Sequence, residues 1–278
     1  MLIAPPYLPA AAAMQIVTTK HTIHSVVNAM PRTCPSRPRP RPAIREGAGV
    51  RNGRPRVPPD LRVHLRGQFM RIAIIGAGNV GGAIARACVQ TGHDVVITAA
   101  DPGNAQDVAS KTGAQAADTN AAAAQGADMV VLAVPYAAVE SVASEIAGGV
   151  SGRVVLDATN PLKPDYSGLA VTDRSAAEVL QESLPQAAVV KAFNTVFATN
   201  QADPVVDGTR LDGFYAGDDE AAKEKVADLL TAVGYRPIDV GGLAAARALE
   251  HMAFLNISLN AGHGWQWRSG WKLVGPTT

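Results

Sequence analysis

A glycine-rich loop of six residues is the feature that most constrains what this chain can fold into. It follows directly on the apolar run of residues 71–75, leads into an alanine-rich segment, and reads Gly76-Ala77-Gly78-Asn79-Val80-Gly81. In this spacing the first glycine permits a tight turn, the second lets a pyrophosphate approach the backbone, and the third lets helix and strand pack closely. The amides at the start of the following helix would face that anion. The loop therefore predicts a dinucleotide site at the start of a β-α-β unit.

Beyond the loop, apolar segments of strand length alternate with helical segments. The predicted strands cover residues 71–75, 94–98, 127–134, 153–158, 187–193, 211–216 and 236–240. The predicted helices cover residues 80–90, 104–111, 137–147, 175–184, 218–233 and 243–260. Uninterrupted apolar strands that alternate with helices are typical of a parallel sheet covered on both faces. We predict an α/β fold, a doubly wound Rossmann-type parallel sheet with a C-terminal β-α-β extension and a terminal helix.

Charge divides the chain near Met70. The 278 residues include 25 basic and 24 acidic side chains, but residues 1–69 carry a net charge of +9 and residues 70–278 one of −8. Residues 1–69 are rich in arginine and proline and lack the periodicity of a core, so we predict a disordered leader. The alternatives are an upstream extension of a chain that starts at Met70, a targeting segment, or a basic arm. We expect a dinucleotide-binding domain over residues 70–200. Over residues 201–278 we expect a β-α-β unit, a helix and a tryptophan-rich tail packed on the same sheet.

Composition and missing motifs exclude several other classes. No run of 18 apolar residues is present, and the two cysteines, Cys34 and Cys88, cannot build a disulfide framework. The histidines form no His-Glu-x-x-His motif and the cysteines no Cys-x-x-Cys motif, so we predict no metal site. A Gly-x-Ser-x-Gly elbow is absent, which argues against an α/β hydrolase. We expect a cytoplasmic protein that binds neither nucleic acid nor membrane.

Further motifs follow the glycine loop in a fixed order. They are Ala133-Val134-Pro135, Ser175-Ala176-Ala177-Glu178, Lys191-Ala192-Phe193-Asn194-Thr195, Ala216-Gly217-Asp218-Asp219 and Arg236-Pro237-Ile238-Asp239-Val240-Gly241. With these motifs, residues 70–259 resemble the NADP-dependent reductases of the deazaflavin coenzyme F420, which share a cofactor-binding segment with pyrroline-5-carboxylate reductases. The segment is also similar to the reductase domain of the membrane metalloreductases. The resemblance implies an oxidoreductase that uses NADP or NAD, with F420 or a flavin as a second cofactor.

The resemblance also implies which residues line the cofactor site. In that family the nicotinamide and the ring of the second cofactor stack at the carboxyl ends of the strands, where open α/β sheets bind ligands. Carried over by position, the lining comprises Ala133, Val134 and Pro135, then Asn160 and Pro161, then Ala192, Phe193 and Asn194. The two asparagines could each hold an amide or ring carbonyl, or shape a turn. No catalytic side chain is predicted, because hydride transfer between two rings depends on stacking and exclusion of water.

The end of the second strand bears on the choice between NAD and NADP. An acid there binds the ribose of NAD, and in the family a Ser-Arg pair binds the 2′-phosphate of NADP. This chain has Ala99 and Ala100 at the positions of that pair, and Asn104 at the position of a nearby basic residue. Asp101 could bind a ribose diol or, as we favour, form a turn that caps the next helix. We therefore predict a weak or reversed preference for NADPH over NADH.

The leading hypothesis is an NAD(P)H-dependent reductase that passes hydride between a nicotinamide cofactor and a flavin-like acceptor, namely F420, FMN, FAD or a metal chelate. The alternative is a non-catalytic dinucleotide-binding redox sensor or partner-binding module. The expected partner is a small-molecule redox acceptor, and a homodimer is a candidate assembly. We expect Lys191 to face solvent at a strand end and His251 to pack within the terminal helix. The three tryptophans within residues 265–271 are expected to dock the tail on the core, with ring cover or a dimer interface as alternatives.

Overall fold

A computed structural model describes residues 69–277, which all belong to a single compact unit. Apart from Phe69, the leader predicted over residues 1–69 lies outside the described residues. No helix within the described range is long and apolar enough to cross a membrane.

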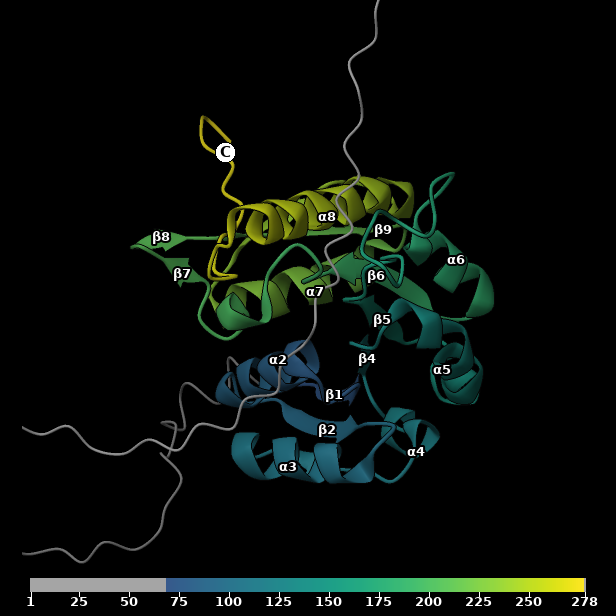
Figure 1. The fold of residues 1–278 in the computed structure, drawn as a ribbon. Coiled ribbons are helices and arrows are strands. Elements are labelled where there is room, and N and C mark those ends of the chain that lie inside the picture. Colours follow the sequence, from purple (N-terminus) through teal and green to yellow (C-terminus); the bar gives the residue numbers. More distant parts are fainter. Residues whose placement is uncertain (1–68, 278) are drawn as a thin grey trace, which may run out of the picture. The chain divides into compact units, whose positions relative to one another are not determined.

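The central element is an eight-stranded sheet in the order β10-β9-β6-β5-β4-β1-β2-β3 (Figure 1). Its strands are β1 (Arg71–Ile75), β2 (Asp94–Thr98), β3 (Gln115–Ala116), β4 (Met129–Leu132), β5 (Val154–Asp157), β6 (Ala188–Ala192), β9 (Asp212–Gly217) and β10 (Arg236–Asp239). Six of these strands follow the order 3-2-1-4-5-6 that is typical of dinucleotide-binding sheets. The order reverses beside β1, and this reversal is where such sheets bind their ligands.

Helices cover both faces of the sheet and enclose two apolar cores. The α-helices are α2 (Asn79–Gln90), α3 (Pro102–Thr112), α4 (Asn120–Ala124), α5 (Val139–Ile146), α6 (Ala176–Ser183), α7 (Glu220–Val233) and α8 (Ala246–His263). Short 3-10 helices are η1 (Tyr136–Ala138), η2 (Ala147–Gly149), η3 (Ala198–Asn200) and η4 (Leu243–Ala245). Side chains of α2, α3 and α7 share one core with the strands, and those of α4, α5, α6 and α8 share the other. Burial on both faces explains why the strands are continuously apolar.

The C-terminal extension joins the sheet through one reversed strand. β9 runs antiparallel to β6, whereas β10 runs parallel to β9, so β9, α7 and β10 form the predicted β-α-β unit. The parallel sheet predicted from the sequence is confirmed for the other pairings and wrong for this one. The connection explains the reversal, because between β6 and β9 the described chain holds only η3 and the hairpin of β7 (Val205–Val206) and β8 (Thr209–Arg210). Residues 193–211 are numerous enough for a parallel crossover, but they contain no α-helix, the element that usually forms one.

The predicted elements agree closely with the observed ones. β1 and β2 have the predicted bounds, and the other predicted strands and helices differ by a few residues at their ends. β3, α4 and the β7–β8 hairpin were not predicted. They are too short to show a helical or alternating period, so the sequence carries no signal for them.

Candidate dinucleotide-binding site

Two of the three loop glycines are required by the backbone itself. Gly76 has a φ of +115°, and a Cβ at this position would lie 2.3 Å from the carbonyl oxygen of Ala133. A Cβ on Gly81 would lie 1.8 Å from the carbonyl oxygen of Gly76. Both distances are far below van der Waals contact, so a side chain would force the loop away from β4 or α2. The tight turn and the close packing predicted for these two glycines are therefore present.

Gly78 differs, because its missing side chain leaves open space. Its backbone is extended (φ −80°, ψ −167°), and no atom lies within 4 Å of its Cβ position. Gly78 is also the N-cap of α2, and no side chain caps that helix. Side chains cap α3, α4, α6 and α7, whereas α5 and α8, which directly follow 3-10 helices, also lack a side-chain cap. The free amides and positive dipole end of α2 beside open space suit an anion such as a pyrophosphate.

The turn after β4 lies beside this loop at the carboxyl edge of the sheet. The amide of Ala133 donates to the carbonyl oxygen of Ile75 over 2.9 Å, which ties the ends of β4 and β1 together. Val134 is half-buried and Pro135 is exposed, so this turn offers apolar surface next to the loop. The geometry brings the loop and the Ala133–Pro135 turn to one place, as expected from the strand order.

Asn160 and Asn194 meet at the ends of β5 and β6. Nδ2 of Asn160 donates to the main-chain oxygen of Asn194 (3.0 Å), and Nδ2 of Asn194 donates to Oδ1 of Asn160 (3.0 Å). Asn194 is 5% exposed, and its Oδ1 has no hydrogen-bond partner among the described residues. Phe193 has a φ of +64°, a left-handed conformation that costs a bulky residue about 1–3 kcal/mol. A strained turn with an unpaired buried acceptor is typical of a functional site.

The expectation that Lys191 faces solvent is wrong. Its side chain is fully buried, and its Nζ lies 2.8 Å from Oδ2 of Asp157 and 3.1 Å from Oε1 of Glu250. Burial by itself would lower the pKa of Lys191, but the two carboxylates outweigh it and raise the pKa above its usual value. The lysine therefore stays charged and is not available to a ligand phosphate.

Sequence reasoning missed Asp157 and Glu250 as partners of this lysine. The available signal was a charged residue near the end of each of two neighbouring apolar strands, since Asp157 and Lys191 are register partners. His251, next to Glu250 on α8, is exposed, and its Nδ1 lies 2.8 Å from the carbonyl oxygen of Arg247. The packing role predicted for this histidine is therefore wrong.

Of the three tryptophans expected to dock the tail, one packs against the core. Trp271 packs against the core that α8 shares with the sheet. Trp265 and Trp267 remain 47% and 43% exposed, and the ring of Trp267 meets that of Phe197 edge-on at 5.4 Å. The docking of the tail therefore depends on Trp271 and on polar contacts more than on the other two rings.

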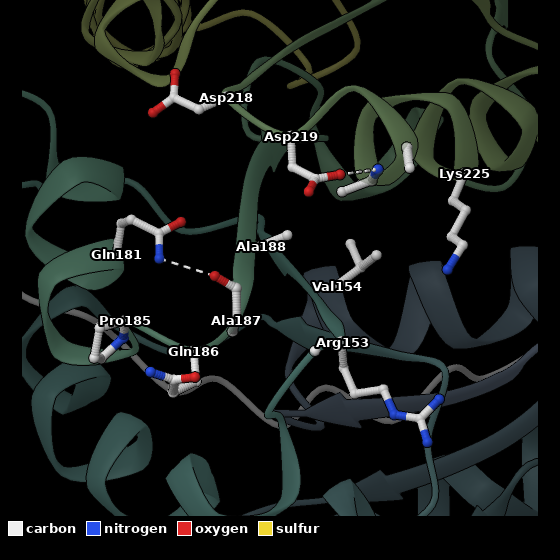
Figure 2. Close-up of a pocket in the computed structure, with 13 residues that line it drawn as sticks. Arg153, Val154, Gln181, Pro185, Gln186, Ala187, Ala188, Asp218, Asp219 and Lys225 are labelled. Atoms are coloured by element: carbon white, nitrogen blue, oxygen red, sulfur yellow. Dashed lines mark hydrogen bonds between the residues drawn. The ribbon is translucent and has the colours of Figure 1, made fainter.

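A hollow of about 620 Å³ lies at the opposite edge of the sheet (Figure 2). It is bordered by the starts of β5 and β6, the chain after α6 and the first turn of α7, with charged side chains at Arg153, Asp218, Asp219 and Lys225. None of the predicted site residues lines it, because those residues follow the carboxyl ends of the parallel strands. The hollow is thus separate from the candidate dinucleotide site.

Comparison with known proteins agrees with this geometry. The sequence profile of a family described as "NADP oxidoreductase coenzyme F420-dependent" matches residues 71–161. The F420-dependent NADP reductase of Methanothermobacter thermautotrophicus is 34% identical over 213 residues, which cover 70% of this chain and 91% of that protein. The chain belongs to the F420-dependent NADP reductase family. It is therefore an oxidoreductase by family, as its motifs predicted.

Two further relatives show how much of this chain the similarity covers. A crystal structure from Arthrobacter sp. FB24, provisionally assigned as an F420-dependent NADP reductase, matches with a TM-score of 0.68 and 30% identity, covering 74% of this chain and 100% of that one. The metalloreductase STEAP3 of Rattus norvegicus is 29% identical over 181 residues, which cover 65% of this chain but 36% of that protein. The likeness to the metalloreductase therefore concerns only part of that larger protein.

The positions at which the family resemblance implies a 2′-phosphate clamp hold no cation in this chain. Ala99 is half-buried and Ala100 exposed at the end of β2. Asp101 caps α3, because its Oδ1 accepts a hydrogen bond from the amide of Gly103 over 2.8 Å. Arg71 offers no substitute, since it begins β1 at the opposite edge of the sheet. The capping role that we favoured for Asp101 is confirmed.

Proposed function

We propose that this protein transfers hydride between NADP(H) and coenzyme F420. Two features at one edge of the sheet carry the proposal. They are the uncapped start of α2 beside the open position of Gly78, and the unpaired Oδ1 of Asn194 at the end of β6. The cofactors follow from family membership, since the curated relatives are named F420-dependent NADP reductases.

We propose that the dinucleotide lies across the point where the strand order reverses. The pyrophosphate and adenosine would contact Gly76, Ala77, Gly78, Asn79, Val80, Gly81 and Ala99. The nicotinamide and the deazaflavin would lie near Ala133, Val134, Pro135, Asn160, Pro161, Ala192 and Asn194. The open Gly78 position and the free amides of α2 support the first set, and the unpaired acceptor of Asn194 supports the second.

When bound, the two cofactors would supply the redox chemistry: a hydride would pass from the reduced nicotinamide to the oxidised deazaflavin with uptake of one proton from solvent, and the reverse reaction would release that proton. The chain binds and orients the two rings. Val134 and Pro135 would exclude water from them with apolar surface, and Asn194 would fix ring orientation by accepting a hydrogen bond. Lys191 does not act as a general acid in this scheme, because two carboxylates hold it in the interior.

The proposal is tested by supplying NADPH or NADH with each of four acceptors: F420, FMN, FAD and a ferric chelate. We expect turnover with F420 and slow or no turnover with the others. A protein that binds NADPH but reduces none of the four would instead fit the redox-sensor alternative. Faster reduction of the ferric chelate than of F420 would point to a metalloreductase activity.

We further propose a homodimer that buries the outward side of α8. Leu255 is 49% exposed, and Leu259, one helical turn further along, is only half-buried. A helix with apolar residues on its outer as well as its inner side favours a second packing partner. Analytical ultracentrifugation should show a dimer that Leu255→Glu converts to a monomer, and a monomeric wild-type protein would contradict the proposal.

We also propose that the protein acts in the cytoplasm, because its proposed substrate NADP(H) is an intracellular cofactor. Its partner there would be a small-molecule redox acceptor. Immunodetection after cell fractionation should place the chain in the cytoplasmic fraction. Recovery from the membrane fraction or from the culture medium would contradict this location.

A further inference from the structure

β5 and β6 end in two matched cross-strand contacts. Asp157 and Lys191 are register partners on these parallel strands, and their side chains form a buried ion pair at 2.8 Å. Three residues further along the chain in each case, beyond the strand ends, Asn160 and Asn194 form the two hydrogen bonds described above. In both pairs the partners are 34 residues apart in the sequence. Among the described side chains, the ion pair is therefore the last hydrogen-bonded contact between the two chain segments before the amide pair.

The ion pair is held firmly by its surroundings. Oδ1 of Asp157 accepts from the amide of Thr159 over 2.8 Å, so both oxygens of this carboxylate are used. Glu250 approaches Nζ of Lys191 from α8 and also accepts from the amide of Ala176 at the start of α6, at 3.0 and 3.2 Å from its two oxygens. Glu250 thus connects Lys191 to two helices, whereas Asp157 alone connects it to β5.

A buried ion pair stabilises a fold only weakly, because the cost of desolvation offsets most of the attraction. It does fix geometry, which is what a ligand site beside it requires. The turn after β6 needs such support, since the left-handed backbone of Phe193 persists only where its surroundings hold it. Nε2 of Gln201 holds the other side of this turn by donating to the carbonyl oxygen of Phe193 over 3.1 Å.

We propose that the Asp157–Lys191 ion pair positions the Asn160–Asn194 amide pair, so that Oδ1 of Asn194 accepts a hydrogen bond from an amide N–H of a bound ring. The inference rests on the proposed function. Asp157 and Lys191 are positioning residues in this account, because neither touches the ligand. Asn194 is the residue that would make the contact.

Two rings in the proposed reaction carry such a donor. The carboxamide of the nicotinamide has N–H groups, and so does the pyrimidinedione part of the deazaflavin. Both present an N–H next to a carbonyl oxygen, which suits a side-chain amide. Binding measurements with each cofactor alone show which of the two N–H groups is the donor, and they need no turnover.

The test compares Asp157→Asn with a matched control, Glu250→Gln. Each variant removes one negative charge beside Lys191 without changing the side-chain size. An asparagine at position 157 has one oxygen for two donors, the amide of Thr159 and Nζ of Lys191, so one of them loses its acceptor. A glutamine at position 250 keeps Oε1, which lies within 3.1 Å of both of its donors, so the contacts survive.

Dissociation constants are measured by calorimetry for NADP, for its fragment ADP-ribose 2′-phosphate, and for F420. We expect Asp157→Asn to weaken either NADP or F420 by about tenfold, the order of one lost hydrogen bond. The fragment, which lacks the nicotinamide, should bind as in the wild type, and Glu250→Gln should leave all three constants unchanged. Weaker NADP identifies the carboxamide as the donor, and weaker F420 identifies the deazaflavin.

Equal effects of the two variants, or equal weakening of NADP and its fragment, would overturn the inference. No effect of Asp157→Asn on either cofactor would overturn it as well. If the wild type binds neither cofactor, the proposed function itself fails. Should Asp157→Asn not fold, the triple variant Asp157→Asn, Lys191→Met, Glu250→Gln removes every charge of the cluster and is expected to show the same selective loss.

Discussion

At the residue scale, the three glycines of the loop have different structural roles. Gly76 and Gly81 cannot carry a Cβ because backbone oxygens occupy that space, whereas a Cβ on Gly78 would meet no atom within 4 Å. The first two are therefore needed for folding. Gly78 is not required by packing, and its place at the start of α2 in the dinucleotide motif favours a role in binding.

Replacement of Gly78 by valine is expected to abolish dinucleotide binding without loss of stability. The new side chain would fill the space that a pyrophosphate needs, and the extended backbone of Gly78 tolerates any residue. Calorimetric titration with NADPH measures the binding, and thermal unfolding measures the stability. Gly148→Val is the control, because Gly148 also faces open space but lies away from the site. Normal NADPH affinity of Gly78→Val would show that the loop does not bind the cofactor.

Introduction of an arginine at Ala100 is expected to raise the preference for NADPH over NADH by about ten- to a hundredfold. A hydrogen bond to a charged group contributes roughly 1.5–3 kcal/mol, and about 1.4 kcal/mol corresponds to tenfold. Ser110→Arg adds the same charge further along α3 and should leave the ratio of dissociation constants unchanged. A wild-type preference for NADPH above about a hundredfold would mean that residues elsewhere hold the 2′-phosphate.

Sequence spacing alone predicted the roles of Gly76 and Gly81, because a backbone motif is local. Asp101 was recognised as a cap for the same reason. The environment of Lys191 was not predictable in this way, since its partners Asp157 and Glu250 are brought to it only by the register of β5 with β6 and by the packing of α8. A contact among three elements cannot be recognised from the sequence of any one of them.

At the element scale, the tail is held to β9 by a buried carboxylate. The oxygens of Asp212 accept from both Arg236 (2.6 and 2.7 Å) and Lys272 (2.9 Å), and from the amide of Leu273 (2.6 Å). Periodicity predicted the strands and helices well but predicted neither this tether nor the antiparallel pairing of β9. The tether depends on the register of β9 with β10, in which Asp212 and Arg236 are partners, and on the irregular tail. The antiparallel pairing follows the irregular connection after β6, where no sequence period exists.

Asp212→Asn is expected to release the tail and to destabilise the fold by roughly 2 kcal/mol, the size of a hydrogen bond to a charged group. Trp271, which packs near this tether, should become solvated, with a red shift of tryptophan emission and faster proteolysis within the tail. The exposed Asp203→Asn serves as the control. Unchanged emission and stability in Asp212→Asn would show that the tether is dispensable.

The same carboxylate predicts how tail docking depends on pH. Burial by itself would raise the pKa of Asp212, but hydrogen bonds from Arg236, Leu273 and Lys272 outweigh it and lower the pKa below its usual value. A carboxyl group with a lowered folded-state pKa contributes stability above its unfolded pKa of about 3.9 and loses it as the pH falls through the folded value. Tryptophan emission should thus stay constant from neutral pH down to about 4 and shift only below it. A shift near pH 6 would contradict this assignment.

At the scale of the whole molecule, we propose that the chain from Met70 onward is a self-sufficient domain. Among residues 69–277, the first strand begins at Arg71, and both apolar cores draw their side chains from Met70 onward. A chain that begins at Met70 should unfold in one cooperative transition and bind NADPH as the full chain does. Non-cooperative unfolding of the shorter chain would show that residues 1–69 contribute to the domain.

The fold class followed from the sequence because apolar strand segments alternate with helical segments over residues 71–260. The reaction did not follow in the same way, since hydride transfer between two rings requires no acid, base or metal motif. The assignment of the reaction rests on the fold, on the candidate anion site at the start of α2 and on family membership. The decisive measurement must therefore follow the hydride itself.

The most direct test supplies NADPH that carries deuterium at both C4 positions and examines reduced F420 by mass spectrometry. Direct transfer within one site predicts one deuterium in each F420 molecule formed and one NADPH consumed per F420. The Gly78→Val protein should form no labelled product. Reduced F420 without deuterium would contradict direct hydride transfer, and a protein that binds NADPH yet reduces no F420 would contradict the proposed function.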